Sequence, residues 1–169
     1  MCSSDLDVKI IQAETADQIE QARTLFREYE SWLGLSLCFQ NFENELAELP
    51  GAYARPDGRL LLARESGELA GCVALRKLTD TTCEMKRLFL RDAFRGKGMG
   101  RLLVETIIGN AKEIGYERML LDTLPPRMND AIALYRSMGF REIAPYYDNP
   151  VEGAIFMELT LGTRASLPA

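Results

Sequence analysis

A glycine-rich segment at residues 90–100 combines residue types and a spacing that suit the binding of a pyrophosphate. It reads Leu-Arg-Asp-Ala-Phe-Arg-Gly-Lys-Gly-Met-Gly, after an apolar strand-like run and before an apolar run with helical periodicity. A helix N-terminus presents unpaired backbone N–H groups with partial positive charge, and glycine lets a ligand approach the backbone closely. Arg95, Lys97 and Arg101 add cations where an anion would lie. The segment therefore predicts a phosphate-binding loop.

Other phosphate-binding motifs fit this segment less well. A Walker A loop requires a serine or threonine after its lysine, and Lys97 is followed by Gly98. The dinucleotide fingerprint requires Gly-x-Gly-x-x-Gly, whereas the glycines here stand at alternate positions, Gly96, Gly98 and Gly100. A turn that only tightens a strand-to-helix connection is the remaining alternative, but such a turn has no need of three cations.

Two blocks of the sequence resemble a known family. Residues 95–100 fit the Arg/Gln-x-x-Gly-x-Gly/Ala signature of the GNAT (Gcn5-related) N-acetyltransferases, which binds the pyrophosphate of acetyl-CoA. Residues 131–140 read Ala-Ile-Ala-Leu-Tyr-Arg-Ser-Met-Gly-Phe and are similar to a second block of that family. In element order the resemblance extends from about Val8 to Leu161, and its specific motifs lie between Cys83 and Phe140.

The resemblance implies which residues hold acetyl-CoA, the expected co-substrate. In the family, the strand before the loop offers its backbone to the pantetheine arm, and the Leu90 N–H is the candidate group that polarises the thioester carbonyl. Family helices often begin Asn-x-x-Ala-Ile-x-Leu-Tyr; that asparagine falls at Met128 here, and Asn129 lies one position later. The expected cofactor-binding residues are Leu88, Phe89, Leu90, Arg95, Gly96, Lys97, Gly98, Met99, Gly100, Arg101 and Asn129.

Two further residues are candidates for proton transfer. Tyr135 matches the family tyrosine beside the cofactor sulfur, and a phenol with a pKa near 10 can donate to a leaving thiolate; the alternative is an aromatic ring that only packs on the core. Glu84 has the spacing before Arg95 at which several GNAT enzymes carry a glutamate base, and burial in an apolar strand is expected to raise its pKa. A salt bridge with Lys86 or Arg87 is the alternative, and a chain of water molecules would then replace the base.

The elements that must position these residues follow from hydrophobic periodicity and turn signals. A capping box at Thr15–Gln18 opens a first helix whose apolar stripe reaches Leu33. Further helices are expected at residues 42–49, 99–115 and 129–138, and strands at 8–12, 59–64, 69–75, 82–90, 119–124, 140–143 and 154–161. This order matches the GNAT fold. The resemblance to this fold implies an α/β (α+β) single domain with a mixed, twisted sheet of about seven strands and helices on both faces.

The composition excludes several classes of function. The 169 residues are 47% hydrophobic and 27% charged, which suits one globular domain, and a net charge of −5 disfavours bulk binding to nucleic acid. The sequence has no apolar run as long as a membrane span and no secretory signal, so we expect no membrane partner and a cytoplasmic location. The chain has no histidine, and its cysteines are scattered, which predicts buried free thiols and no metal site. The cysteines are Cys2, Cys38, Cys72 and Cys83.

The expected function is acetyl transfer from acetyl-CoA to a primary amine of a small metabolite or amino-acid-like molecule, directly within a ternary complex. A protein N-terminus or lysine as acceptor, and a non-catalytic acyl-CoA-binding sensor, are the alternatives. A homodimer is left open. In this fold the acceptor site is expected near the first helices and the last strand pair. Candidate acceptor-site residues are Trp32, Phe39, Phe42, Tyr146, Tyr147, Asp148, Asn149 and Glu152, with Asp148 or Glu152 to pair with an ammonium.

Overall fold

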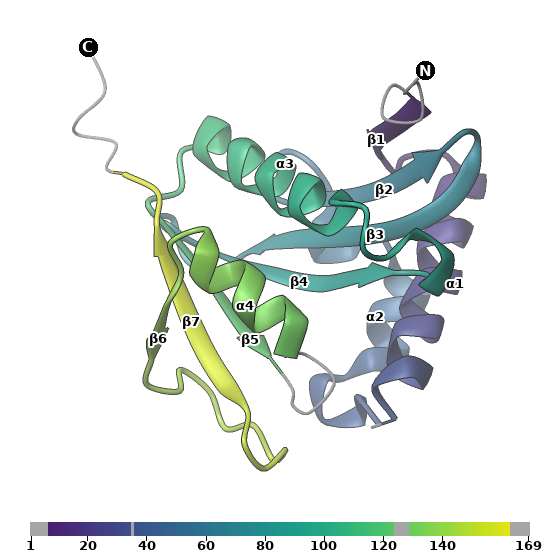
Figure 1. Ribbon diagram of the computed structural model, residues 1–169. Coiled ribbons are helices and arrows are strands. Elements are labelled where there is room, and N and C mark those ends of the chain that lie inside the picture. The colour runs from purple at the N-terminus through teal and green to yellow at the C-terminus, as the bar shows by residue number, and fades with distance from the viewer. Residues whose placement is uncertain (1–6, 35, 124–128, 163–169) are drawn as a thin grey trace.

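The computed structural model describes residues 7–34, 36–123 and 129–162, and these residues build one seven-stranded sheet (Figure 1). The strands are β1 (Val8–Gln12), β2 (Arg59–Glu65), β3 (Glu68–Lys77), β4 (Thr82–Leu90), β5 (Arg118–Thr123), β6 (Arg141–Ile143) and β7 (Ile155–Thr160). Their order in the sheet is β1-β2-β3-β4-β5-β7-β6. Only β4 and β5 run parallel among these neighbours; the other pairs are antiparallel. The predicted mixed sheet is therefore confirmed.

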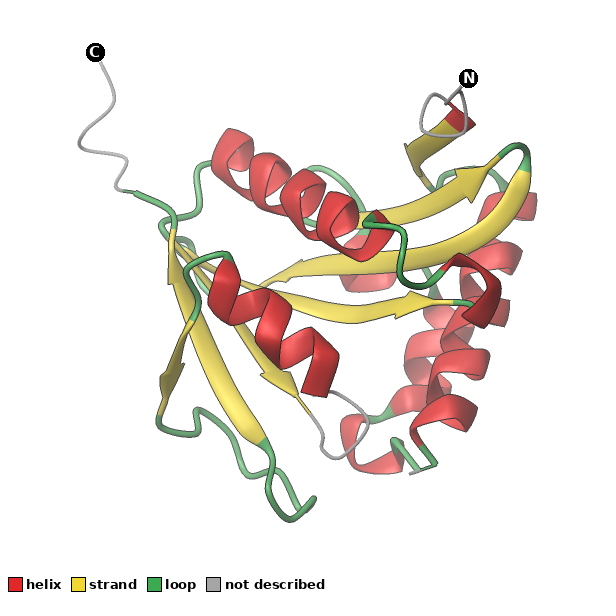
Figure 2. Ribbon diagram, viewed as in Figure 1, coloured by secondary structure: helices red, strands yellow, loops and turns green. Residues whose placement is uncertain are grey.

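Helices cover both faces of the sheet, as predicted (Figure 2). The α-helices are α1 (Ala16–Leu33), α2 (Phe42–Glu48), α3 (Met99–Ile114) and α4 (Asn129–Ser137), and short 3-10 helices lie at η2 (Cys38–Gln40), η3 (Gly51–Tyr53) and η4 (Asp92–Phe94). Successive strand residues point to opposite faces. Leu60 and Leu62 of β2 accordingly join the core under α1 and α2, whereas Leu61 and Ala63 join the core under α3.

The helix ends form where the sequence signals predict them. Thr15 caps α1 through a reciprocal capping box, in which Thr15 Oγ1 accepts from the Gln18 N–H and Gln18 Oε1 accepts from the Thr15 N–H. Gly115 ends α3 in the left-handed conformation at φ 110°, which glycine adopts without strain. Element bounds differ from the expected ranges by only a few residues at each end.

Strands β4 and β5 separate after three paired positions. Their parallel register ends at Glu84 opposite Leu120, while β4 continues to Leu90 and β5 to Thr123. Past Glu84, the edge of β4 that faces β5 has no strand beside it among the described residues. Figure 1 shows the two strands diverging behind α4.

On its other edge, β4 pairs with β3 through an irregularity. Cys72 lies opposite Phe89 and Ala74 opposite Lys86, so β4 has one more residue than β3 between these pairs. Arg87 lies in the irregular part of β4 and adopts φ 64°, the left-handed region that a side chain normally avoids. The backbone of β4 is thus bent beside the opening.

Cys72 and Cys83 are buried free thiols, as predicted, whereas Cys38 is exposed and Cys2 lies outside the described residues. Within the described part of the chain, His, Cys, Asp and Glu side chains form no group that could hold a metal ion. No described helix is both long and apolar enough to span a membrane.

Candidate active site

The glycine loop places the N-terminus of α3 next to open space. Gly98 is the N-cap of α3, at φ 85°, and no side chain of the described residues caps this helix. Gly96 adopts φ 78°. A Cβ atom at either glycine would meet no described atom within 4 Å. These glycines are therefore needed for the left-handed backbone and leave the helix N-terminus accessible to an anion.

A cavity of about 320 Å³ lies between this loop, the end of β4 and the start of α4. It brings together most of the residues predicted to hold the cofactor. They are Leu88, Phe89, Leu90, Arg95, Gly96, Gly98, Gly100 and Arg101. Two more, Lys97 and Met99, line an adjacent surface hollow together with Gly98 and Arg101.

Asn129 is the predicted cofactor residue that lines neither this cavity nor the adjacent hollow. It is exposed at the first position of α4, and the cavity wall there is formed by Asp130, Ala131 and Leu134. Met128, where the family asparagine would fall, lies outside the described residues.

Arg95 fastens the loop to the end of β4. Its Nε donates to the Leu90 carbonyl over 2.8 Å, and its Nη1 lies 2.8 Å from Asp92 Oδ1. Its guanidinium carbon lies 4.7 Å from the ring centroid of Trp32 and 5.6 Å from that of Phe89. Arg95 therefore supplies positive charge to the cavity and also orders the loop.

The other two loop cations have looser acidic partners. Lys97 Nζ lies 3.5 Å from Glu65 Oε2, and Arg101 Nε lies 3.3 Å from Glu105 Oε2. About half of each cation's side-chain surface is exposed, so these pairs are weak and a bound anion could replace them.

Tyr135 of α4 is buried at the opening between β4 and β5. It lines a second, narrow cavity of about 20 Å³, together with Lys86, Leu88 and Asp122. Burial raises the pKa of its phenol above the ordinary value, and the nearby Tyr29 and Asp122 raise it further. The side chain is therefore protonated at neutral pH, as a proton donor must be.

Glu84 is held by charged and polar partners rather than by apolar surroundings. Arg76 Nε and the Tyr146 hydroxyl each donate to it over 2.7 Å, and Lys86 Nζ lies 4.0 Å from Oε1. Burial alone would raise the pKa of Glu84, but Lys86, Arg76 and the two hydrogen bonds outweigh it and hold the pKa below the ordinary value. The expected rise in pKa is wrong, because Arg76 faces Glu84 from the neighbouring strand.

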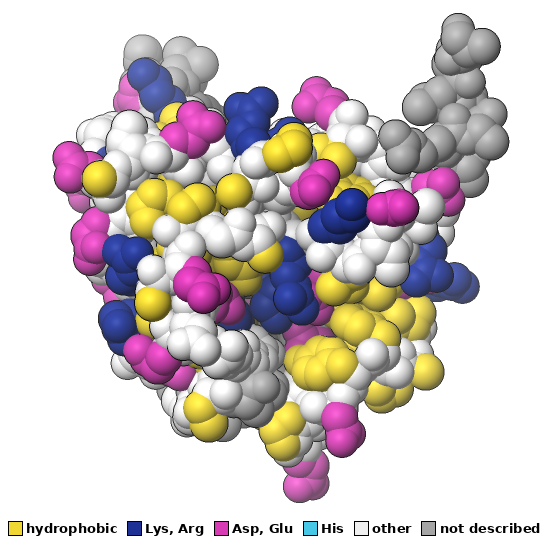
Figure 3. Space-filling view, turned by 180° about the vertical axis from the view of Figure 1, so that it is seen from behind, with side chains coloured by type: hydrophobic (Ala, Val, Ile, Leu, Met, Phe, Trp, Pro, Cys, Tyr) yellow, Lys and Arg dark blue, Asp and Glu magenta, His cyan; other side chains and the backbone are white. Residues whose placement is uncertain are grey.

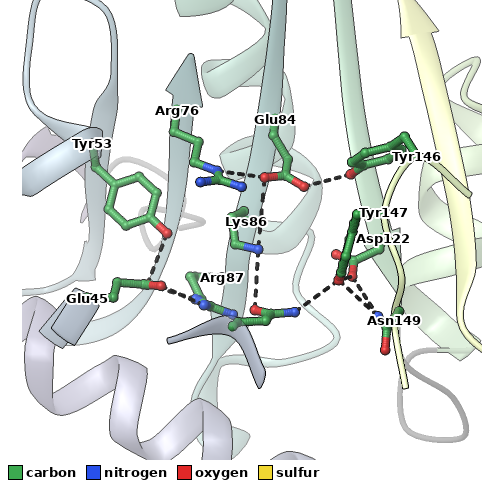
Figure 4. Close-up of polar contacts among 11 residues, drawn as sticks. Glu45, Tyr53, Arg76, Glu84, Lys86, Arg87, Asp122, Tyr146, Tyr147 and Asn149 are labelled. Atoms are coloured by element: carbon green, nitrogen blue, oxygen red, sulfur yellow. Dashed lines mark hydrogen bonds and ion pairs between the residues drawn. The ribbon is translucent and has the colours of Figure 1, made fainter. Parts of the chain in front are cut away.

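Glu84 is one member of a partly buried polar layer that the sequence did not reveal (Figure 4). In this layer Lys86 Nζ donates to Gln40 Oε1 over 3.3 Å, and Gln40 Nε2 donates to the Tyr147 hydroxyl over 3.2 Å. The Tyr147 hydroxyl donates in turn to Asp122 Oδ2. We call the following residues the polar layer: Gln40, Glu45, Tyr53, Arg76, Glu84, Lys86, Arg87, Asp122, Tyr146, Tyr147 and Asn149.

Arg87 and Glu45 tie the polar layer to α2. Arg87 Nε and Nη2 donate to the two carboxylate oxygens of Glu45 over 2.9 and 2.7 Å, and the Tyr53 hydroxyl donates to Glu45 Oε2 over 3.0 Å. The guanidinium carbon of Arg87 lies 5.0 Å from the ring centroid of Phe42. This bidentate pair fixes the irregular part of β4 against α2.

The residues expected to line an acceptor site are distributed among several environments. Tyr146, Tyr147 and Asn149 belong to the polar layer. Asp148 and Glu152 are exposed. Of the aromatic candidates, Phe42 is a core residue and Trp32 lines the cavity at the glycine loop; the side chain of Phe39 lies outside what the structure describes.

Comparison with known proteins gives consistent matches. The model of the Acetyltransferase (GNAT) family matches residues 19–140. An uncharacterized N-acetyltransferase from Dictyostelium discoideum is 35% identical, over 91% of this chain and 99% of the relative. One from Schizosaccharomyces pombe is 38% identical, over 92% and 96%. The structure of yncA from Salmonella typhimurium with its cofactor acetyl-CoA is similar at a TM-score of 0.64 and 21% identity, covering 96% of this chain and 99% of that one, which shows a shared fold.

Proposed function

The chain belongs to the acetyltransferase (GNAT) family and is an N-acetyltransferase, and from this premise we propose its reaction. It transfers the acetyl group of acetyl-CoA to the primary amine of a small, amino-acid-like acceptor, directly within a ternary complex. One observation carries this proposal: Leu88 lines both the cavity at the glycine loop and the narrow cavity beside Tyr135. A cofactor bound at the first cavity can therefore present its acyl end at the second.

The residues around the larger cavity suit a pyrophosphate and a pantetheine arm. Gly96 and Gly98 leave the N-terminus of α3 open, and Arg95, Lys97 and Arg101 supply positive charge. The edge of β4 at residues 88–90 has no described strand beside it and can hydrogen-bond to the amide groups of the arm. The Leu90 N–H is our candidate for polarising the thioester carbonyl. Acetyl-CoA supplies the acetyl group as an activated thioester.

Tyr135 is the proposed proton donor to the leaving thiolate. Its raised pKa keeps the phenol protonated, and Tyr135 lines the narrow cavity, which shares Leu88 with the cavity at the glycine loop. The proton moves from the phenol to the sulfur as the bond between sulfur and the acetyl carbon breaks. Burial of the site disfavours a free thiolate, so donation by Tyr135 avoids forming one, and the proton that the attacking amine releases through water returns to the phenoxide.

The attacking amine must lose a proton before or during its attack. Glu84 was predicted as the base, but its lowered pKa makes it a weak proton acceptor at neutral pH. We therefore assign the proton transfer to water. Glu84 has a positioning role instead: it holds Arg76 and Tyr146 at the opening between β4 and β5.

A turnover assay tests the proposal. The protein and acetyl-CoA are mixed with one class of amine in each sample: free amino acids, polyamines or peptides with a free N-terminus. The release of free thiol is then followed. The proposal expects thiol release that depends on an added small amine and matches the amount of acetylated product. Binding of acetyl-CoA without amine-dependent release would instead identify a sensor, and turnover only with peptides would identify a protein acetyltransferase.

A further inference from the structure

Two cations at the opening between β4 and β5, the buried Lys86 and the partly exposed Arg76, share one carboxylate. Arg76 Nε lies 2.7 Å and Lys86 Nζ 4.0 Å from the same atom, Glu84 Oε1, and the second oxygen of Glu84 accepts from the neutral Tyr146 hydroxyl. The next cation along β4, Arg87, is satisfied by both oxygens of Glu45. Arg76 and Lys86 therefore have one carboxylate within ion-pair distance between them in the described structure, which leaves both able to bind a further anion.

Lys86 has the least complete set of partners in the polar layer. Only 8% of its side chain is exposed, and its Nζ has one hydrogen bond, to Gln40 over 3.3 Å, besides the long ion pair to Glu84 in the described structure. An ammonium group has three donors, and a buried charge normally has all of them paired. Burial and the neighbouring Arg87 lower the pKa of Lys86, as expected for a poorly neutralised cation. The side chain lines the same narrow cavity as Tyr135.

A carboxylate lines the same cavity as this cation. Asp122 Oδ2 accepts from the Tyr147 hydroxyl and from Asn149 Nδ2, and no described residue donates to its other oxygen, Oδ1. The cavity is therefore lined by one carboxylate and two cations, Lys86 and Arg87. Arg87 is paired with Glu45, whereas Lys86 and Asp122 are not within ion-pair distance of each other in the described structure. This arrangement is complementary to a molecule with both an anionic and a cationic group.

We propose that the acceptor is an α-amino acid, or an analogue with a free carboxylate next to its amine. Lys86 and Arg76 bind the carboxylate, and Asp122 attracts the ammonium toward Tyr135. This assignment rests on the proposed acetyltransferase function and specifies its substrate class.

The acceptor has a route from the surface to this position. A hollow of about 250 Å³ is lined by Arg76, Tyr53 and Gln40, and Gln40 also lines the narrow cavity beside Tyr135. On the face opposite to the view of Figure 1, Lys and Arg side chains gather in a central depression with hydrophobic side chains along one edge (Figure 3). The narrow cavity of about 20 Å³ has room for little more than a water molecule, so binding of the acceptor requires displacement of the Gln40 side chain, which would join the hollow to the cavity.

Matched acceptors test the assignment. Free L-α-amino acids, the corresponding carboxamides and the corresponding amines without a carboxyl group are compared at saturating acetyl-CoA, by thiol release and product mass. We expect kcat/KM to be at least about tenfold higher with the free carboxylate. Equal or better turnover of the carboxamides would overturn the inference and leave the acetyltransferase function intact. Failure of every amine, while acetyl-CoA still binds, would overturn the proposed function itself, and this inference with it.

Variants of the two cations test their role independently. Lys86→Met keeps most of the side-chain volume, and Arg76→Gln provides a second test in case Lys86→Met does not fold. Each should lower kcat/KM for amino acids by about tenfold while changing that for carboxamides little. Lys77→Gln is the matched control, because Lys77 follows Arg76 on β3 but forms its ion pair with Asp80, which does not belong to the polar layer. A preference for free carboxylates that survives in folded Lys86→Met and Arg76→Gln would contradict the assignment.

Discussion

Arg76 of β3 and Glu84 of β4 lie opposite each other and form an ion pair, with Arg76 Nε donating to Glu84 Oε1 over 2.7 Å. Glu84 is 1% exposed, so this pair connects two strands inside the protein. The other carboxylate oxygen accepts from Tyr146, which precedes β7. Glu84 thereby joins the two sides of the opening between β4 and β5, where we place the acceptor.

Replacement of Glu84 by glutamine should destabilise the protein in a pH-dependent way. The pKa of Glu84 is lowered on folding, so its ion pairs stabilise the fold above the unfolded value of about 4.3 and lose this effect as pH falls through the lower folded pKa. Glu84→Gln should therefore reduce the free energy of unfolding by about 3 kcal/mol at pH 7 and by progressively less below about pH 4. Urea denaturation of both proteins over this range measures the difference, and a constant difference would refute the pKa assignment.

The same variant distinguishes the two roles of Glu84 in catalysis. If Glu84 only positions its neighbours, Glu84→Gln should leave the affinity for acetyl-CoA unchanged and lower kcat. The pH range over which the rate rises toward alkaline pH should then be the same as in the parent protein. Loss or displacement of that limb in Glu84→Gln would identify Glu84 as the base after all.

Tyr135→Phe should impair chemistry without impairing binding. The substitution removes one hydroxyl and keeps the ring that packs against Phe140 with a centroid distance of 5.5 Å. If the phenol protonates the leaving thiolate, single-turnover rates should fall by about 10²-fold, with acetyl-CoA affinity nearly unchanged. Tyr116→Phe is the control, because Tyr116 is a buried tyrosine whose hydroxyl donates to the Asp57 carbonyl away from the site. Full activity of Tyr135→Phe would show that Tyr135 is not the proton donor and only packs in the core.

Changes in the glycine loop should weaken the binding of acetyl-CoA. Gly98→Val places a side chain in the space beside the α3 N-terminus, and Arg95→Glu puts a negative charge next to the pyrophosphate. Each should weaken affinity by at least about tenfold, or roughly 1.4 kcal/mol, in calorimetric titrations.

A matched glycine separates this effect from backbone strain. Gly67 lies in the turn between β2 and β3 at φ 84°, nearly the φ of Gly98, and a Cβ there also meets no described atom within 4 Å. Gly67→Val should therefore carry a similar cost in stability and leave cofactor affinity unchanged. Unaltered affinity in folded Gly98→Val would show that the cofactor binds elsewhere.

Glu45→Gln should destabilise the fold far more than the same change at a neighbouring position. It weakens the bidentate pair to Arg87, whose side chain is 3% exposed, at a cost of about 3 kcal/mol. Glu43 also lies on α2, but its partner is 3.6 Å away and both side chains are largely exposed. Glu43→Gln should change the free energy of unfolding by less than about 0.5 kcal/mol. Equal effects of the two substitutions would contradict the structural importance of the Arg87 pair.

The glycine loop could be predicted from the sequence because its signals are local. The spacing of Gly96 and Gly98, the adjacent cations and the apolar helix that follows all lie within one short segment. The element order follows likewise from periodicity within each element, whereas the helices on both faces were implied by the resemblance of that order to the GNAT fold. The loop's cavity then brings together residues already grouped along the chain.

The polar layer could not be predicted because its partners are far apart along the chain. Arg87 pairs with Glu45, and Glu84 bonds to Tyr146, across 42 and 62 positions. These pairings depend on the register of β3 and β4, which shifts at the irregularity beside Arg87. The sequence offered one partial signal, the charged pair Lys86 and Arg87 within an otherwise apolar strand, but it could not give the partner of either.

The most direct test of the central claim is the stoichiometry of transfer with and without an acceptor. The protein is loaded with acetyl-CoA and mixed with free L-α-amino acids, and thiol, acetylated amine and intact protein mass are measured in the same samples. Our account predicts that one acetylated amino acid forms for each thiol released, that little thiol forms without an amine, and that the protein mass stays unchanged. Tight binding of acetyl-CoA with no amine-dependent thiol release would contradict it.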